Sequence, residues 1–148
     1  MIDLSEVQNS REALTGGIKS DQPAENLDIP KQCFVYEIEG PLFFGTVRKF
    51  ELATERAQAN CRVLILRMRN TIYIDAGGIK ALEQAKAAFD RKGIQIVISG
   101  IHTQPYLLLE KTGMADKLGR ENIYDNINSA LERARAIITA ADGSQTKA

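Results

Sequence analysis

Four consecutive aliphatic residues, Val63-Leu64-Ile65-Leu66, place the strongest constraint on how this chain folds. Successive side chains of a strand point to opposite faces, so a strand made of this run is apolar on both faces. Such strands are typical of the centre of a parallel sheet that helices cover on both sides. No longer aliphatic run occurs, and a membrane-spanning helix needs roughly 18 apolar residues. The sequence therefore predicts a soluble α/β protein.

Strand and helix patterns alternate on either side of this run. Residues 33–38 alternate in the manner of a strand, with Phe34, Tyr36 and Ile38 on one face. A long helix is expected after Asp75, with one apolar side and with Gly93 as its end. The inward residues of that helix are expected to be Ile79, Leu82, Ala85 and Phe89. The other expected elements are a helix over 46–60, a strand over 94–98, a short helix capped by Thr103 that ends at Gly113, a short strand over 122–124 and a closing helix over 125–139.

This order of elements predicts the fold class and the domain limits. Strands that alternate with helices favour an α/β domain with one core and right-handed crossovers. We expect a mostly parallel central sheet of about four to five strands, flanked by about four helices. Residues 1–27 are polar and lack periodicity, which indicates a flexible linker arm, and 141–148 are expected to form a disordered tail. The folded domain is thus predicted over 28–140.

Composition excludes several classes of function. Nineteen Lys and Arg balance nineteen Asp and Glu, so the formal net charge is zero, which argues against a nucleic-acid-binding protein. The chain has two cysteines and one histidine, too few for a structural zinc site. We expect Cys33 and Cys61 to be buried as small hydrophobes and His102 to lie in a loop without a catalytic role. No metal, no cofactor and no enzymatic activity are predicted.

Charged residues give no catalytic pattern either. The chain lacks both common glycine-rich phosphate-binding patterns, GxGxxG and GxxxxGK[ST]. Glu37 and Glu39 share one strand face and are expected to be solvated. Arg67 and Arg69, with Arg62 nearby, form a basic run. The zero net charge argues against a nucleic-acid-binding stripe there, and a local patch for a partner or for lipid headgroups is the alternative.

The segment Asp75-Ala76-Gly77-Gly78 opens the long predicted helix and allows two interpretations. In the first, Asp75 caps the helix and the glycines permit a tight entry. In the second, this helix start meets an anion or a partner surface. Leu42-Phe43-Phe44 follows the first strand and also allows two interpretations. Either both Phe residues belong to the core, or one of them is exposed.

Two motifs resemble those of a known family. Gly40-Pro41-Leu42-Phe43-Phe44-Gly45 and Ile74-Asp75-Ala76-Gly77-Gly78-Ile79 are similar to segments of the STAS domain, which sulfate transporters share with anti-sigma factor antagonists. The likeness covers about residues 28–139 in element order and is greatest to the cytoplasmic C-terminal domain of sulfate permease (SulP) family anion transporters. The start, Met1-Ile2-Asp3-Leu4-Ser5-Glu6-Val7, looks like the linker that leaves the last membrane helix of such transporters.

The resemblance implies a non-enzymatic regulatory and interaction domain. Its partner would be the membrane transport domain of the same polypeptide, on the cytoplasmic side of the inner membrane. The resemblance also allows other partners: a soluble protein, a second copy of the chain, or a small anion or nucleotide at the helix start. The alternative is a free-standing antagonist-type signalling protein. In the antagonists a serine of this loop is phosphorylated, and Ala76 stands at that position here, so no phosphorylation site is expected.

The expected contact surface lies at the carboxyl ends of the strands. Loops that follow parallel strands meet at that edge of the sheet. A helix start with small side chains lets another backbone approach closely. The predicted partner-binding residues are Leu42, Phe43, Phe44, Asp75, Ala76, Gly77, Gly78 and Lys80.

Overall fold

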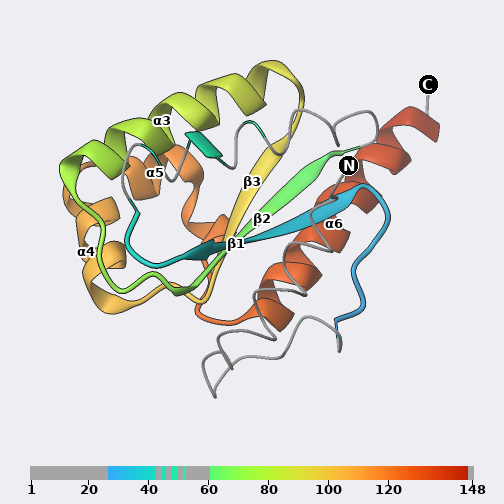
Figure 1. Cartoon of the computed structure of the whole chain (residues 1–148). Helices are drawn as coiled ribbons and strands as arrows, with labels where there is room; N and C mark the ends of the chain where they lie inside the picture. The colour runs from blue at the N-terminus through green and yellow to red at the C-terminus, as the bar shows by residue number, and fades with distance from the viewer. Residues whose placement is uncertain (1–26, 43–44, 46–47, 50–51, 53–60, 147–148) are drawn as a thin grey trace.

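A three-stranded parallel sheet with the order β1-β2-β3 forms the centre of the molecule (Figure 1). The structure is a computed structural model, and it describes residues 27–42, 45, 48–49, 52 and 61–146. The strands are β1 (Cys33–Glu39), β2 (Val63–Asn70) and β3 (Gln95–Ser99). In register, Val35 lies beside Ile65 and Ile65 beside Val97. As the apolar run predicts, β2 is the central strand.

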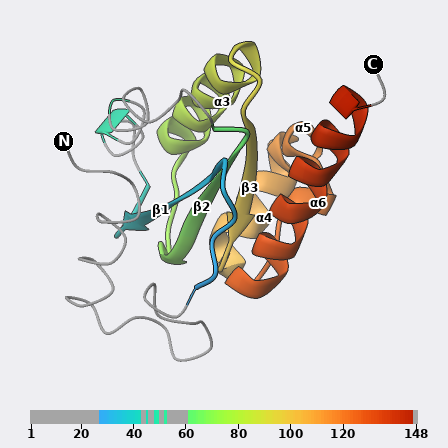
Figure 2. The ribbon, with the colours of Figure 1, turned by 90° about the vertical axis from the view of Figure 1, so that its right-hand side faces the viewer.

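Helices follow β2 and β3 in the predicted order. They are α3 (Ala76–Arg91), α4 (Thr103–Lys111), α5 (Met114–Leu118) and α6 (Ile127–Thr146), and a single 3₁₀ turn, η2 (Arg120–Asn122), precedes α6. Figure 2 shows α3 and α6 on opposite sides of the sheet. The predicted helix over 46–60 lies mostly outside the described residues.

Two apolar clusters fill the space on the two sides of the sheet. On the α3 side, Leu64, Leu66 and Met68 of β2 pack with the inward residues of α3 and with parts of α4 and α5. On the α6 side, Val63 and Ile65 pack with the buried side of α6. The four inward residues predicted for α3 are all buried: Ile79, Leu82, Ala85 and Phe89. The α/β class with a parallel sheet is thereby confirmed.

The structure departs from the predictions in strand number and at the C-terminus. The described residues contain three paired strands, where four to five were expected. The predicted strand over 122–124 is reduced to one bridge between Ile98 and Ile123, because η2 ends at Asn122 and α6 begins at Ile127. The helix α6 continues to Thr146, through most of the residues predicted to form a disordered tail.

Candidate functional site

The start of α3, at the carboxyl ends of the strands, contains most of the predicted site residues. Asp75 is the N-cap of α3, and its Oδ1 accepts a hydrogen bond from the backbone N–H of Gly78 at 2.7 Å. This bond satisfies one of the N–H groups that every helix leaves free at its start. The capping interpretation of Asp75 is therefore confirmed. Ala76, Gly77 and Lys80 are exposed on the first two turns.

Leu42 packs against the start of α3 and is not accessible to solvent. Its side chain is fully buried, its N–H donates to the carbonyl of Tyr73 at 3.1 Å, and it forms a parallel bridge with Ile74. A Cβ at Gly78 would lie 2.3 Å from the carbonyl oxygen of Leu42, so glycine is needed for this contact. Leu42 and Gly78 are thus buried, and partner binding at this helix start stays a prediction that depends on its exposed residues. Phe43 and Phe44 lie outside the described residues.

Two exposed apolar residues of the same loop were not among the predicted site residues. Ile72 is 67% exposed and Tyr73 is 47% exposed, whereas the flanking Thr71 and Ile74 are fully buried. The sequence Thr-Ile-Tyr-Ile resembles an alternating strand, and strand alternation would have buried Ile72 together with Ile74. The turn after β2 breaks the alternation and turns both Ile72 and Tyr73 outward.

The first turn of α4 holds this loop in place. Gln104 pairs with the backbone of Ile74 in both directions: its Oε1 accepts from the N–H at 2.9 Å and its Nε2 donates to the carbonyl at 3.1 Å. The His102 Nε2 lies 2.7 Å from the carbonyl oxygen of Arg69. His102, not Thr103, is the N-cap of α4, and it makes no side-chain capping bond. Thr103 is already inside the helix, which corrects the predicted cap.

A buried ion pair lies just before the loop, where the sequence predicted solvated charges. Glu37 is fully buried, Arg69 is 1% exposed and their Oε1 and Nε atoms are 2.8 Å apart. The Asn70 Nδ2 donates to the other carboxylate oxygen of Glu37 at 2.9 Å. Arg67 is also fully buried, so Arg67 and Arg69 form no surface patch. Burial lowers the pKa of the Arg69 guanidinium from its ordinary value, and the carboxylate of Glu37 opposes that effect.

The other residues that could take part in catalysis or in metal binding are poorly placed for either role. Burial raises the pKa of Cys33 to about 12 and that of Cys61 to about 11, so both thiols stay protonated near neutral pH. Within the described ranges, no three His, Cys, Asp or Glu side chains gather in a way that could hold a metal ion. A groove of about 510 Å³ between α3 and α5 carries charges of both signs, among them Lys86, Asp90 and Glu121.

Comparison with known proteins decides the family. The STAS domain family matches residues 25–130 of the chain. The chain belongs to the STAS domain family. A putative sulfate transporter of Bacillus subtilis, YvdB, is 34% identical over 93 residues, which are 62% of this chain and 18% of that protein. Probable sulfate transporter 4.2 of Arabidopsis thaliana is 21% identical over 87% of the chain and 22% of its own length. The chain thus spans about a fifth of the length of these transporters.

Solved structures agree in fold. A sulfate transporter family protein from Wolinella succinogenes superposes with a TM-score of 0.73 at 30% identity, over 78% of this chain and 94% of that one. The STAS domain of a SulP transporter from Vibrio cholerae gives 0.68 at 33% identity, over 76% and 88%. The STAS domain described here is therefore of the transporter-associated kind. None of its described helices has the length and apolar character needed to span a bilayer.

Proposed function

We propose that this STAS domain is the non-enzymatic regulatory and interaction domain of a SulP family anion transporter, on the cytoplasmic side of the inner membrane. Its partner would be the membrane transport domain of the same polypeptide. The relatives named above support the proposal, because they are described as sulfate transporters about five times as long as the matched segment. The transported anion would be chosen by the membrane part.

The observation that carries the proposal is the start of α3. Asp75 is held by its capping bond and Gly78 is packed against Leu42, so the loop has one preset shape. Ala76 is exposed and has no hydroxyl, and a phosphate that would add about −1.5 to −2 charge cannot be attached there. A preset helix start with small exposed side chains suits constant contact with another protein better than a phosphorylation switch.

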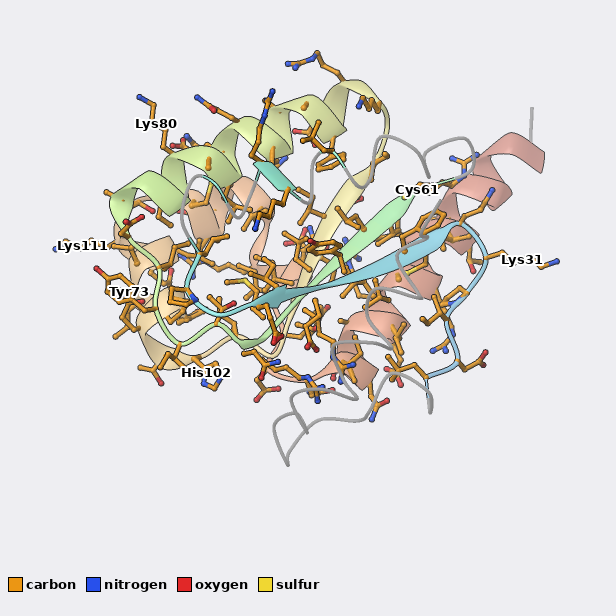
Figure 3. All side chains as sticks on the ribbon, in the orientation of Figure 1. Lys31, Cys61, Tyr73, Lys80, His102 and Lys111 are labelled. Carbon is orange, nitrogen blue, oxygen red and sulfur yellow. The ribbon has the colours of Figure 1, made fainter. Side chains whose placement is uncertain are left out.

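Charge reversal at the helix start tests the contact in the transporter that carries this domain. Ala76→Glu combined with Lys80→Glu is expected to reduce anion transport, or capture of the separately expressed transport domain, by about fivefold or more, as for residues that matter in an interface. Both positions are exposed, so the circular dichroism of the isolated chain stays unchanged. Lys31→Glu is the matched control, because Lys31 is exposed at the opposite end of the molecule (Figure 3).

Three results would contradict the proposal. Unchanged transport and capture in the double variant would leave Asp75–Gly78 as a helix cap only. An equal loss in Lys31→Glu would show a general effect of charge. A gene that encodes this domain without any membrane part would instead favour the free-standing signalling protein.

A further inference from the structure

Exposed apolar side chains gather at one end of the molecule. Of the four large hydrophobic residues that are exposed in the described part of the chain, three belong to the loop before α3 or to α4. Ile72 is 67% exposed, Tyr73 is 47% exposed and Leu107 is 59% exposed. Leu107 lies one turn after Gln104, the residue that binds the backbone of Ile74. The loop therefore contacts the first turn of α4, and Leu107 stands on the next turn.

The backbone of this loop is fixed by hydrogen bonds. The carbonyl of Tyr73 accepts from Leu42, and both backbone groups of Ile74 are paired with Gln104. The Thr71 hydroxyl donates to the carbonyl of Ile38 at 3.4 Å. Ile72 and Tyr73 are thus displayed by an ordered loop, and little further entropy is lost when they enter a new environment.

Two lysines flank the exposed apolar residues. Figure 3 shows Lys80 and Lys111 projecting at the same end of the molecule as Tyr73, away from Lys31 and Cys61. Both lysines are exposed, and in the described residues neither belongs to an ion pair, whereas the nearby acidic side chains are engaged. Glu83 pairs with Lys117 and Glu110 pairs with Arg120. At this end, the ammonium groups of both lysines thus have no ion-pair partner among the described residues.

We propose that Ile72, Tyr73 and Leu107, with Lys80 and Lys111, form a lipid-contacting tip that enters the interface of an anionic phospholipid bilayer. Tyrosine favours the level of the headgroups because its ring is apolar and its hydroxyl is polar. Lysine lays its apolar stem along the apolar surface and places its ammonium group at the phosphates. The core of a protein–protein contact is depleted in lysine, so Lys111, which is not part of the contact proposed for the transport domain, favours lipid at this tip.

The tip is small, so its contribution is that of a second anchor. A single small apolar group gives only marginal and reversible membrane binding. Attachment to a membrane protein raises the effective concentration of lipid around the tip, and weak contacts then become occupied. The inference uses the proposed function only for this nearness to a bilayer; the lipid contact itself is tested on the 148-residue chain alone.

Fluorescence provides a direct test, because the chain contains no tryptophan. In Tyr73→Trp the sole indole stands in the tip, and in the control Lys31→Trp it stands at the other end of the molecule. Vesicles of phosphatidylcholine with added phosphatidylglycerol are expected to shift the emission of Tyr73→Trp to shorter wavelength and to leave Lys31→Trp unchanged. Pure phosphatidylcholine vesicles are expected to give a weaker shift.

Co-sedimentation with the same mixed vesicles measures the contribution of each part of the tip. Ile72→Ser with Tyr73→Ser is expected to lower the partition coefficient about tenfold, since the apolar contacts are lost. Lys80→Gln and Lys111→Gln are each expected to lower it about fivefold, and added salt is expected to reduce that difference. Lys31→Gln is expected to change it little. All these positions are exposed, so circular dichroism is expected to show an intact fold.

The inference and the proposed function fail separately. No emission shift with anionic vesicles, or an equal shift in both tryptophan variants, overturns the lipid contact. Binding of the chain to the detergent-solubilised transport domain through Tyr73, without binding to vesicles, overturns it in favour of a protein contact. A lipid shift together with unchanged transport in Ala76→Glu, a change that leaves both tip lysines in place, overturns the proposed function alone.

Discussion

The two faces of the sheet are built from different chemistry, although the same three strands supply both. Towards α3, the strands present an apolar layer, which in β2 extends from Leu64 to Met68. Towards α6, the apolar cluster contains Val63 and Ile65, and buried Arg67 follows on the same side. In register, Arg67 lies between Glu37 and Ser99 of the neighbouring strands, which are also fully buried. Because side chains alternate along a strand, one face of this sheet is apolar and the other combines apolar and charged residues.

The difference shows where this fold tolerates buried charge. The ion pair Glu37–Arg69 lies at the carboxyl ends of the strands, next to the loop that leads into α3. A buried pair costs desolvation, and it is kept only when hydrogen bonds satisfy the remaining polar atoms. Asn70 supplies one of these bonds to Glu37. The α6 face thus joins β1 to the end of β2 by directional contacts, and the α3 face joins the elements by packing.

The largest expected effect is removal of the charge on the α6 face. Glu37→Ala leaves the buried guanidinium of Arg69 without its carboxylate, and we expect a loss of about 3–5 kcal/mol in the free energy of unfolding. Glu37→Gln keeps the size of the side chain and is expected to lose most of the same stability. Urea unfolding of the 148-residue chain measures both. Leu66→Ala, expected to cost about 2–5 kcal/mol, is the comparison on the α3 face. A Glu37→Gln variant as stable as the parent would show that the charge is dispensable.

A smaller effect is expected where the α3 face is packed most closely. Gly78→Ala would place Cβ 2.3 Å from the carbonyl oxygen of Leu42 and 2.9 Å from Cγ1 of Ile74, and we expect a loss of about 1–3 kcal/mol from overpacking. At Gly77 the nearest atom to an added Cβ is Asp75 Oδ1 at 3.3 Å, which a small rotation of that side chain relieves. Gly77→Ala is expected to be neutral or stabilising by up to about 1 kcal/mol, because alanine favours helix. Thermal unfolding compares the two variants, and equal losses would contradict the packing assigned to Gly78.

The last comparison concerns the reactivity of two cysteine thiols, one on each face of the sheet, and has the smallest expected effect on the fold. Cys33 belongs to the α6-side cluster and Cys61 packs against the α3-side cluster. With its pKa raised to about 11, Cys61 is expected to react with a thiol reagent at pH 8 about a hundredfold more slowly than an ordinary cysteine, because only the thiolate reacts. Cys33, with a pKa of about 12, is expected to react only after unfolding. Fast labelling of Cys33 in the folded chain would show that the α6 side opens more readily than the α3 side.

The same two thiols are expected to make the stability of the fold depend on pH. Folding raises both thiol pKa values above the ordinary 9.0, so above pH 9 the unfolded chain loses protons that the folded chain keeps. Stability is therefore expected to fall as the pH rises from about 9 to 12. Replacement of both cysteines by alanine is expected to remove this part of the alkaline loss in urea unfolding at pH 8 and pH 10.

Some of this organisation is readable from the sequence and some is not. The central place of β2, the inward side of α3 and the cap at Asp75 follow from local patterns, and the structure confirms them. The burial of Glu37 and Arg67 does not follow, because it depends on which residues face each other across the strands. A charged residue within a strand looks solvated until its neighbour in the sheet is known.

The candidate site divides in the same way. The helix start was found from the small residues that follow Asp75, whereas the role of Gln104 depends on a contact with Ile74, 30 residues earlier in the chain. The sequence around a glutamine in the first turn of a helix does not indicate such a partner. The sequence predicts Leu42 at the surface because its loop follows the first strand at the carboxyl ends of the strands, and only the bridge to Ile74 shows that it belongs to the core.

Gln104 gives the loop before α3 an unusual mechanical linkage. Ile74 has a strand neighbour on one side, Leu42, and on the other side a side-chain amide that makes the bonds of a strand neighbour. That amide is attached to the first turn of α4. A force that shifts α4 against the sheet is therefore transmitted to Ile74 and, one residue later, to the cap of α3. One side-chain amide thus ties the first turn of α4 to the segment that leads into the cap of α3.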